Sequence, residues 1–191
     1  MGVYIALFRG INVGGANILP MKVLKNLLEE IGCEKVQTYI QSGNVVFQNK
    51  NKQRSDLTRE ISAAIQQQFG FAPKVMLLEQ SNLQKAVKEN PYKTSEGKAL
   101  HFYFLDTPPK KPDLDRLQAL KSPSEAFTLK NNVFYLYAPD GIGRSKLAAK
   151  VEQAVGVAAT ARNWNTVSNL LDMIHKTKAA YRVKDSKKKV S

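Results

Sequence analysis

The sequence predicts an α+β protein built from two tandem βαββαβ units with an added C-terminal helix. Two observations carry this prediction. Short apolar runs typical of strands alternate with segments whose apolar residues recur at helical spacing, and the order of these segments in the first 80 residues is repeated after residue 99. No close sequence repeat joins the halves, so the predicted duplication is one of topology.

In the first half, apolar runs bounded by turn residues predict strands at residues 3–8, 36–41, 44–48 and 74–78. The first helix carries apolar residues at i, i+3, i+4 and i+7, namely Leu24, Leu27, Leu28 and Ile31. Gly32 suits the position just after this helix. A second helix is expected from near Ser55 to near Gly70.

The second half repeats this order, with strands expected at residues 100–105, 126–129, 133–137 and 157–162. Helical spacing marks residues 114–120 and 147–155, and a final helix follows. The order in both halves is the split-βαβ, ferredoxin-like arrangement. The expected organisation is a first ferredoxin-like half over 1–80, a helical connector over 81–98, a second half over 99–162, a C-terminal helix over 163–178 and a basic flexible tail over 179–191.

Composition excludes several classes of protein. A hydrophobic share of 43% argues against global disorder, and no apolar stretch approaches the length of a membrane span, so no membrane partner is expected. No signal peptide is recognised, and the single cysteine, Cys33, cannot form an internal disulfide. The expected localisation is therefore cytoplasmic.

The net charge is +13, and nearly half of it lies at the C-terminal end, where residues 176–191 carry seven Lys or Arg and one Asp. Such a tail is typical of a solvated chain end, and the alternative is weak attraction to nucleic acid. The rest of the chain is only mildly basic, which argues against a dedicated nucleic-acid groove.

A first candidate ligand site lies in the loop RGINVGGAN at residues 9–17. In the predicted topology the first and second strands are parallel, with the third antiparallel between them, so this loop lies beside the hairpin at 41–44. Polar and glycine residues suited to a phosphate or carboxylate gather there: Arg9, Asn12, Gly14, Gly15, Asn17, Gln41, Ser42 and Asn44. The alternative is that they only shape turns. The loop is no P-loop, because Ala16 and Asn17 replace the Lys-[Ser/Thr] pair.

A second candidate site follows from the segment GIGRSK at residues 141–146, which precedes a predicted helix. The last strand should end on the same side, so basic groups and a stacking tryptophan are expected to hold a phosphorylated or aromatic ligand. The residues are Arg144, Ser145, Lys146, Arg162, Asn163, Trp164 and Asn165. The alternative is a helix start capped by Ser145, a tryptophan that fills the core, and Asn163 or Asn165 as cap of the final helix.

Residues that could carry catalysis are scarce. His101 and His175 have no metal-ligand spacing to another His, Cys or carboxylate, and no G-x-S-x-G segment is present. The sequence therefore predicts neither a metal nor a cofactor, assigns no catalytic residue, and leaves open whether the protein is an enzyme and what its oligomeric state is.

Four segments carry a resemblance to a known family: ALFRGINVGGAN at 6–17, TYIQSGNVVF at 38–47, GIGRSKL at 141–147 and TARNWNTV at 160–167. With NPY at 90–92 and HFYFL at 101–105, they resemble the bacterial domain-of-unknown-function family 1697 to about residue 175. The resemblance implies two similar ferredoxin-like halves in a cytosolic bacterial protein, and it implies no activity. Phe8 and Cys33 depart slightly from the family pattern.

Three functions are compatible with these residues. The first is binding of a small anionic ligand, containing a phosphate or nucleotide, through the Gly-rich loops. An alternative is binding of single-stranded nucleic acid through a basic surface, although the third strand, SGNVVFQ, lacks paired stacking aromatic residues. A further alternative is an assembly or regulatory module that uses an exposed sheet edge.

Overall fold

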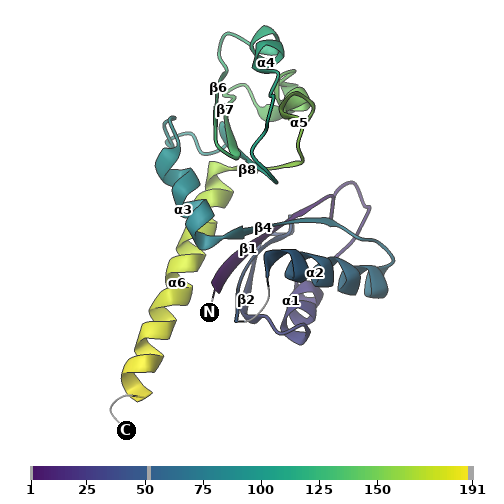
Figure 1. Ribbon diagram of the computed structural model, residues 1–191, viewed down its shortest axis with the longest axis vertical. Coiled ribbons are helices and arrows are strands. Elements are labelled where there is room, and N and C mark those ends of the chain that lie inside the picture. The colour runs from purple at the N-terminus through teal and green to yellow at the C-terminus, as the bar shows by residue number, and fades with distance from the viewer. Residues whose placement is uncertain (1, 51–52, 189–191) are drawn as a thin grey trace. The chain divides into compact units, whose positions relative to one another are not determined.

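The computed structural model describes residues 2–50 and 53–188, and the chain divides into two compact units (Figure 1). Unit 1 comprises the residues up to 84 together with those from 169 onward, and unit 2 comprises residues 85–168. Two helices, α3 (Gln80–Glu89) and α6 (Trp164–Lys188), begin in one unit and end in the other.

Unit 1 contains the first βαββαβ series, whose elements are β1 (Gly2–Arg9), α1 (Met21–Glu30), β2 (Glu34–Tyr39), β3 (Asn44–Asn49), α2 (Arg54–Phe69) and β4 (Lys74–Glu79). The strands form one sheet in the order β2-β3-β1-β4, and all neighbours are antiparallel. Because β3 lies antiparallel between β1 and β2, the end of β1 and the β2–β3 hairpin share one edge of the sheet, as predicted.

Both faces of this sheet are covered. On one face, fully buried side chains of the strands and of both helices form a single core, with contributions from Phe8, Phe47, Leu24, Leu57 and Ile61. Each such side chain contributes about 1.5–3 kcal/mol by leaving water. On the other face, Gln37 is the cross-strand partner of Val46 and donates from Nε2 to Thr177 Oγ1 of α6 at 2.8 Å.

Unit 2 contains the second series, made of β5 (Leu100–Leu105), α4 (Leu114–Leu120), β6 (Ala126–Lys130), β7 (Val133–Tyr137), α5 (Val151–Val155) and β8 (Ala159–Asn163). Its sheet has the equivalent order β6-β7-β5-β8, again with antiparallel neighbours. The two sheets and their helices confirm the α+β class and the two tandem ferredoxin-like units.

The sheet of unit 2 is also buried on both faces. A core around Tyr103, Phe134 and Leu136 packs against α4 and α5. On the other face, Phe102 stacks on Trp164 with ring centroids 5.9 Å apart, and the hydroxyl of Tyr135 donates to the main-chain oxygen of Ala86 at 2.8 Å. The aromatic residues of this face are therefore enclosed by the adjoining parts of α6 and α3.

Two helix boundaries differ from the prediction. The final helix does not end at residue 178, because α6 continues to Lys188 through most of the segment expected to be a flexible tail. The reason is local: residues 178–188 contain no glycine or proline and several good helix formers. Residues 189–191 lie outside the described residues, as do the side chains that carry the charge of the tail.

The helix predicted over 147–155 is the second difference. It is divided into a 3₁₀ turn, Ala148–Lys150, and the short α5, and Lys150 lies at the junction with φ −114° and ψ −2°. Within the described residues, no helix combines the length and apolar character that a bilayer span requires.

Candidate functional site

The first candidate site, the loop after β1, is locked to the neighbouring hairpin by one asparagine. Asn12 Nδ2 donates to the main-chain oxygens of Leu19 at 2.9 Å and of Gln41 at 2.8 Å, while its Oδ1 accepts the amide of Leu19 at 2.7 Å. Its backbone is left-handed, at φ 54°, a conformation that asparagine tolerates. The side chain of Asn12 therefore joins two loops 29 residues apart in sequence.

The other residues of this cluster are used in the same way. Asn17 Nδ2 donates to Gly10 O at 2.8 Å, and Asn44, which is fully buried, donates to Ser42 Oγ at 2.8 Å. Gly14 and Gly15 have positive φ angles and form the turn that the Val13–Ala16 bridge closes. These contacts agree with the alternative in which the loop residues shape turns.

The surface of this loop junction carries apolar as well as polar side chains. Its exposed large apolar residues are Val13, Ile18 and Ile40, which are 69%, 55% and 53% exposed, and Asn17, Gln41 and Ser42 are exposed as well. Arg9 is half-buried at the end of β1, opposite Lys74 of β4. A ligand site for an anion at this junction stays a prediction, and the internal bonds of the amides do not favour it.

The second candidate cluster is divided between two environments. Asn163 Oδ1 accepts the amide of Thr166 at 3.0 Å and so caps α6, as the structural alternative predicted. Trp164 stacks on Phe102, and Asn165 lies so close to Gly97 that a Cβ at this glycine would meet its Oδ1 at 1.8 Å. Arg162 donates to the main-chain oxygen of Ala161 at 2.8 Å; burial lowers its pKa to about 10, which leaves it charged at neutral pH.

The remaining members, Arg144, Ser145 and Lys146, line a hollow of about 350 Å³ in unit 2. Its other lining residues are Leu120, Ser122, Glu125, Ala138, Asp140 and Gly141, so neither Arg162 nor Trp164 belongs to it. Ser145 Oγ accepts the amide of Ala148 at 2.9 Å, a bond of the kind expected of a cap, although Leu147 is the residue at the N-cap of the turn Ala148–Lys150. The expected triad of Arg144, Lys146 and Arg162 is not brought together at this hollow.

Two carboxylates, those of Glu125 and Asp140, line the same hollow as the cations. Glu125, only 6% exposed, accepts the amide of Ser122 at Oε2 at 2.9 Å. Lys121 Nζ donates to the main-chain oxygens of Ser122 and Glu125, at 3.4 Å and 3.1 Å. These bonds hold the turn before β6 in place.

The two acidic residues of the hollow were not predicted from the sequence, although the predicted hairpin could have indicated them. The predicted hairpin of residues 126–129 and 133–137 brings its two ends together, and the observed pair Ala126–Tyr137 places Glu125 next to Ala138. Any loop that follows residue 137 must therefore meet the turn at 122–125. Extending the hairpin register by a few residues would have identified Glu125 and Asp140 as neighbours of the GIGRSK segment.

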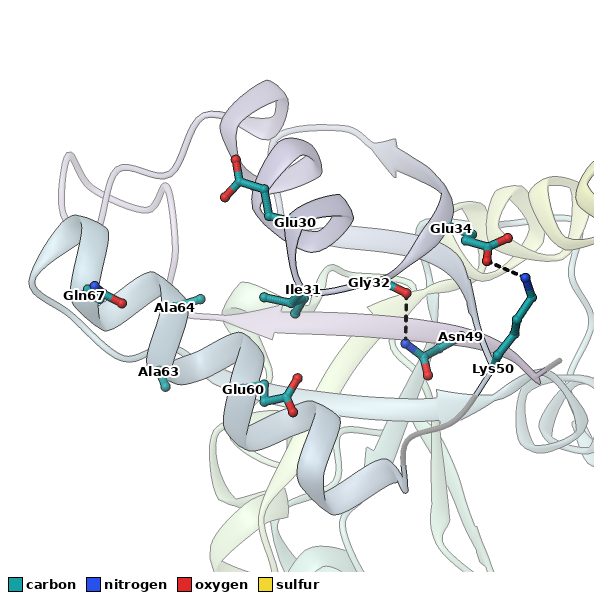
Figure 2. Close-up of a pocket in the computed structure, with 10 residues that line it drawn as sticks. All are labelled: Glu30, Ile31, Gly32, Glu34, Asn49, Lys50, Glu60, Ala63, Ala64 and Gln67. Atoms are coloured by element: carbon teal, nitrogen blue, oxygen red, sulfur yellow. Dashed lines mark hydrogen bonds and ion pairs between the residues drawn. The ribbon is translucent and has the colours of Figure 1, made fainter.

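Unit 1 has a larger hollow, of about 750 Å³, between the end of α1 and the side of α2 (Figure 2). Its walls carry Glu30, Glu34 and Glu60, and Glu34 pairs with Lys50 at 2.8 Å. Asn49 Nδ2 donates to Gly32 O at 3.3 Å beneath them. Three glutamates against one lysine make this hollow unsuited to an anion, and neither predicted ligand site contains any of its residues.

The described residues contain no group of three or more His, Cys, Asp or Glu side chains that could hold a metal ion. His101 is buried, and its Nε2 has no hydrogen-bond partner among the described residues. Burial lowers the pKa of this imidazole, against a smaller opposing effect of a backbone hydrogen bond to Lys98. A neutral histidine within a sheet is typical of a packing role.

Comparison with known proteins identifies a family and a similar structure. A family described as proteins of unknown function, DUF1697, matches residues 1–135. A solved structure, that of the conserved bacterial protein SP0830 from Streptococcus pneumoniae, is similar with a TM-score of 0.68 and 26% sequence identity over 90% of this chain and 98% of that one. The search of curated proteins gave no match. Of the four segments that carried the resemblance, GIGRSKL and TARNWNTV lie beyond the residues that the family matches.

Proposed function

This chain belongs to the family DUF1697, whose function is unknown, and from its geometry we propose that it binds a small anionic ligand, such as a phosphate ester, in the hollow of unit 2. The observation that carries the proposal is that Arg144, Ser145 and Lys146 line one hollow of about 350 Å³. A volume of this order fits a phosphorylated metabolite.

The two cations of this hollow are available for a ligand. Arg144 and Lys146 are exposed, and neither side chain makes a hydrogen bond or an ion pair with another residue in the described parts of the chain. A guanidinium can donate two parallel hydrogen bonds to a phosphate, while an ammonium adds a compact point charge. The hydroxyl of Ser145 lies between them in sequence and can donate, because its bond to Ala148 uses it only as an acceptor.

Binding of single-stranded nucleic acid on the sheets is less well supported. Sheets that bind RNA stack bases on exposed aromatic side chains. Phe102, Phe104 and Tyr135 are all buried, and in unit 1 the face that carries Val46 is covered at Gln37 by α6. A contribution of the basic tail rests on side chains outside those described.

The test is calorimetric titration of the full chain with inorganic phosphate and pyrophosphate at low salt. We expect the double variant Arg144→Ala/Lys146→Ala to bind at least about tenfold more weakly, because hydrogen bonds to charged groups contribute about 1.5–3 kcal/mol each.

The matched control is Lys110→Ala/Lys111→Ala, which removes the same charge from exposed residues of unit 2 that do not line the hollow. This control should bind like the wild type. An equal loss of affinity in both double variants would show that only the net charge matters and would contradict the proposal. The absence of binding by the wild type would also contradict it.

A further inference from the structure

We infer that the ligand of this hollow carries hydroxyl groups next to its phosphate, as a pentose phosphate or the ribose phosphate of a nucleotide does, because Glu125 and Asp140 line the same hollow as Arg144 and Lys146. This inference rests on the proposed function and specifies the class of ligand. Its physical basis is that the hollow offers hydrogen-bond acceptors as well as cations.

Glu125 provides an acceptor that is largely shielded from solvent. The residue is more than nine-tenths buried, and its Oε2 is occupied by the amide of Ser122. Its Oε1 accepts no hydrogen bond from the described residues. Gln48 Oε1 and His101 Nε2 are fully buried without a hydrogen-bond partner, whereas Glu125 Oε1 is not one of these fully buried atoms. A carboxylate with so little water around it is stabilised by a donor that enters the hollow.

Asp140 provides a second acceptor in the lining of the hollow. Ser124 Oγ donates to Asp140 Oδ2 at 2.5 Å, and Ser124 Oγ lies 3.1 Å from Ser122 Oγ. This chain of hydroxyls links the carboxylate to the turn that holds Glu125. Both acceptors are therefore oriented before a ligand arrives, which lowers the entropic cost of binding.

The charges of the lining explain why a bare anion is a poor match. Arg144 and Lys146 are balanced by Glu125 and Asp140, so the wall as a whole has no net charge. A phosphate held at the cationic side is repelled by any carboxylate that it approaches. A ligand with a phosphate at one end and hydroxyls at the other satisfies both sides, because each hydroxyl donates to a carboxylate oxygen.

The experiment compares inorganic phosphate, ribose 5-phosphate, 2-deoxyribose 5-phosphate and phosphoethanolamine by calorimetric titration of the full chain. We expect the wild type to bind ribose 5-phosphate about tenfold more tightly than phosphate, the gain that one charge-assisted hydrogen bond provides. Glu125→Gln should reduce this ratio severalfold while phosphate itself binds as well or better, because a like charge is removed. Asp140→Asn, at an exposed residue, repeats the test without a change at the buried position.

The outcomes separate the inference from the proposed function. If phosphate binds but ribose 5-phosphate binds no more tightly, the hydroxyl inference is overturned and anion binding stands. A preference for phosphoethanolamine over ribose 5-phosphate would show that an ammonium fills the acidic side, and it would also overturn the inference. If none of the phosphates binds, both fail. If the ratio of the affinities for ribose 5-phosphate and phosphate is unchanged in both Glu125→Gln and Asp140→Asn, these carboxylates do not contact the ligand and the inference is overturned.

Discussion

Asn12 should be the residue on which the opening loop of unit 1 depends most. Replacing it with alanine removes three hydrogen bonds, of 2.7, 2.8 and 2.9 Å, to Leu19 and Gln41. Each contributes about 1 kcal/mol net to stability. Leu19 is 0% exposed, so its amide and carbonyl groups would be left without these partners. Alanine at φ 54° costs about 1 kcal/mol more than asparagine, and the expected total loss is about 4 kcal/mol.

Two further variants separate the side-chain bonds from the backbone. Asn12→Gly loses the same bonds but adopts the left-handed conformation freely, so its expected loss is about 3 kcal/mol. Asn131 is the matched control, because it has a similar φ of 53° while its side chain makes one long bond, of 3.5 Å, to Glu89. Asn131→Ala should therefore cost only about 1 kcal/mol.

The assay must report on each unit separately. Trp164 is the single tryptophan of the chain and belongs to unit 2, so its fluorescence follows that unit during denaturant unfolding. Hydrogen exchange of residues 9–44 follows the affected loops of unit 1. The Asn12 variants should lower the opening free energy in exchange by the amounts given. A loss in Asn12→Ala no larger than that in Asn131→Ala would refute the view that this asparagine locks the loops.

Two other predictions concern packing and pH. Gly43→Ala should destabilise unit 1 by about 3 kcal/mol, because its φ is 68° and an added Cβ would lie 2.6 Å from atoms of Phe8 and Ile11. The control Gly70→Ala has a similar φ of 76° but open space around the Cβ, so it should cost only about 1 kcal/mol. Equal losses of stability in the two variants, measured by hydrogen exchange, would contradict the packing argument. Burial lowers the pKa of His101 below its usual 6.5, so the unfolded chain binds the proton more readily than the folded one. The contribution of His101 to the stability of unit 2 is therefore complete above pH 6.5 and is lost as the pH falls below it. Unfolding monitored by tryptophan fluorescence should show a smaller loss of stability at low pH in His101→Gln than in the wild type.

Most of the fold could be predicted from local patterns. The apolar runs and helical spacings placed every strand and the main helices within a few residues, because the periodicity and the turn residues that mark an element lie within that element or at its ends. The topology followed from element order, since a βαββαβ series has few allowed connections. The end of α6 was missed because a basic segment of good helix formers was interpreted as a flexible tail on its charge alone.

The candidate site was predictable only in part. Arg144, Ser145 and Lys146 were identified because they are consecutive in one glycine-containing loop. Glu125 and Asp140 were missed, although the hairpin whose register places them near the GIGRSK segment was itself predicted. Arg162 was expected beside Arg144 but does not line the same hollow, because two strand ends on one side of a sheet can still present their loops to different neighbours.

The sequence alone determined the α+β class, the duplication and the meeting of the RGINVGGAN loop with the 41–44 hairpin, since these depend on periodicity and chain connectivity. It did not determine what that meeting is for. Asn12 has the same donors and acceptor whether it binds an anion or the main chain of Leu19 and Gln41. Only the tertiary structure shows that the Asn12 side chain bonds to the main chain, because these bonds require its left-handed φ and the main-chain oxygens that folding brings within 3 Å of Nδ2.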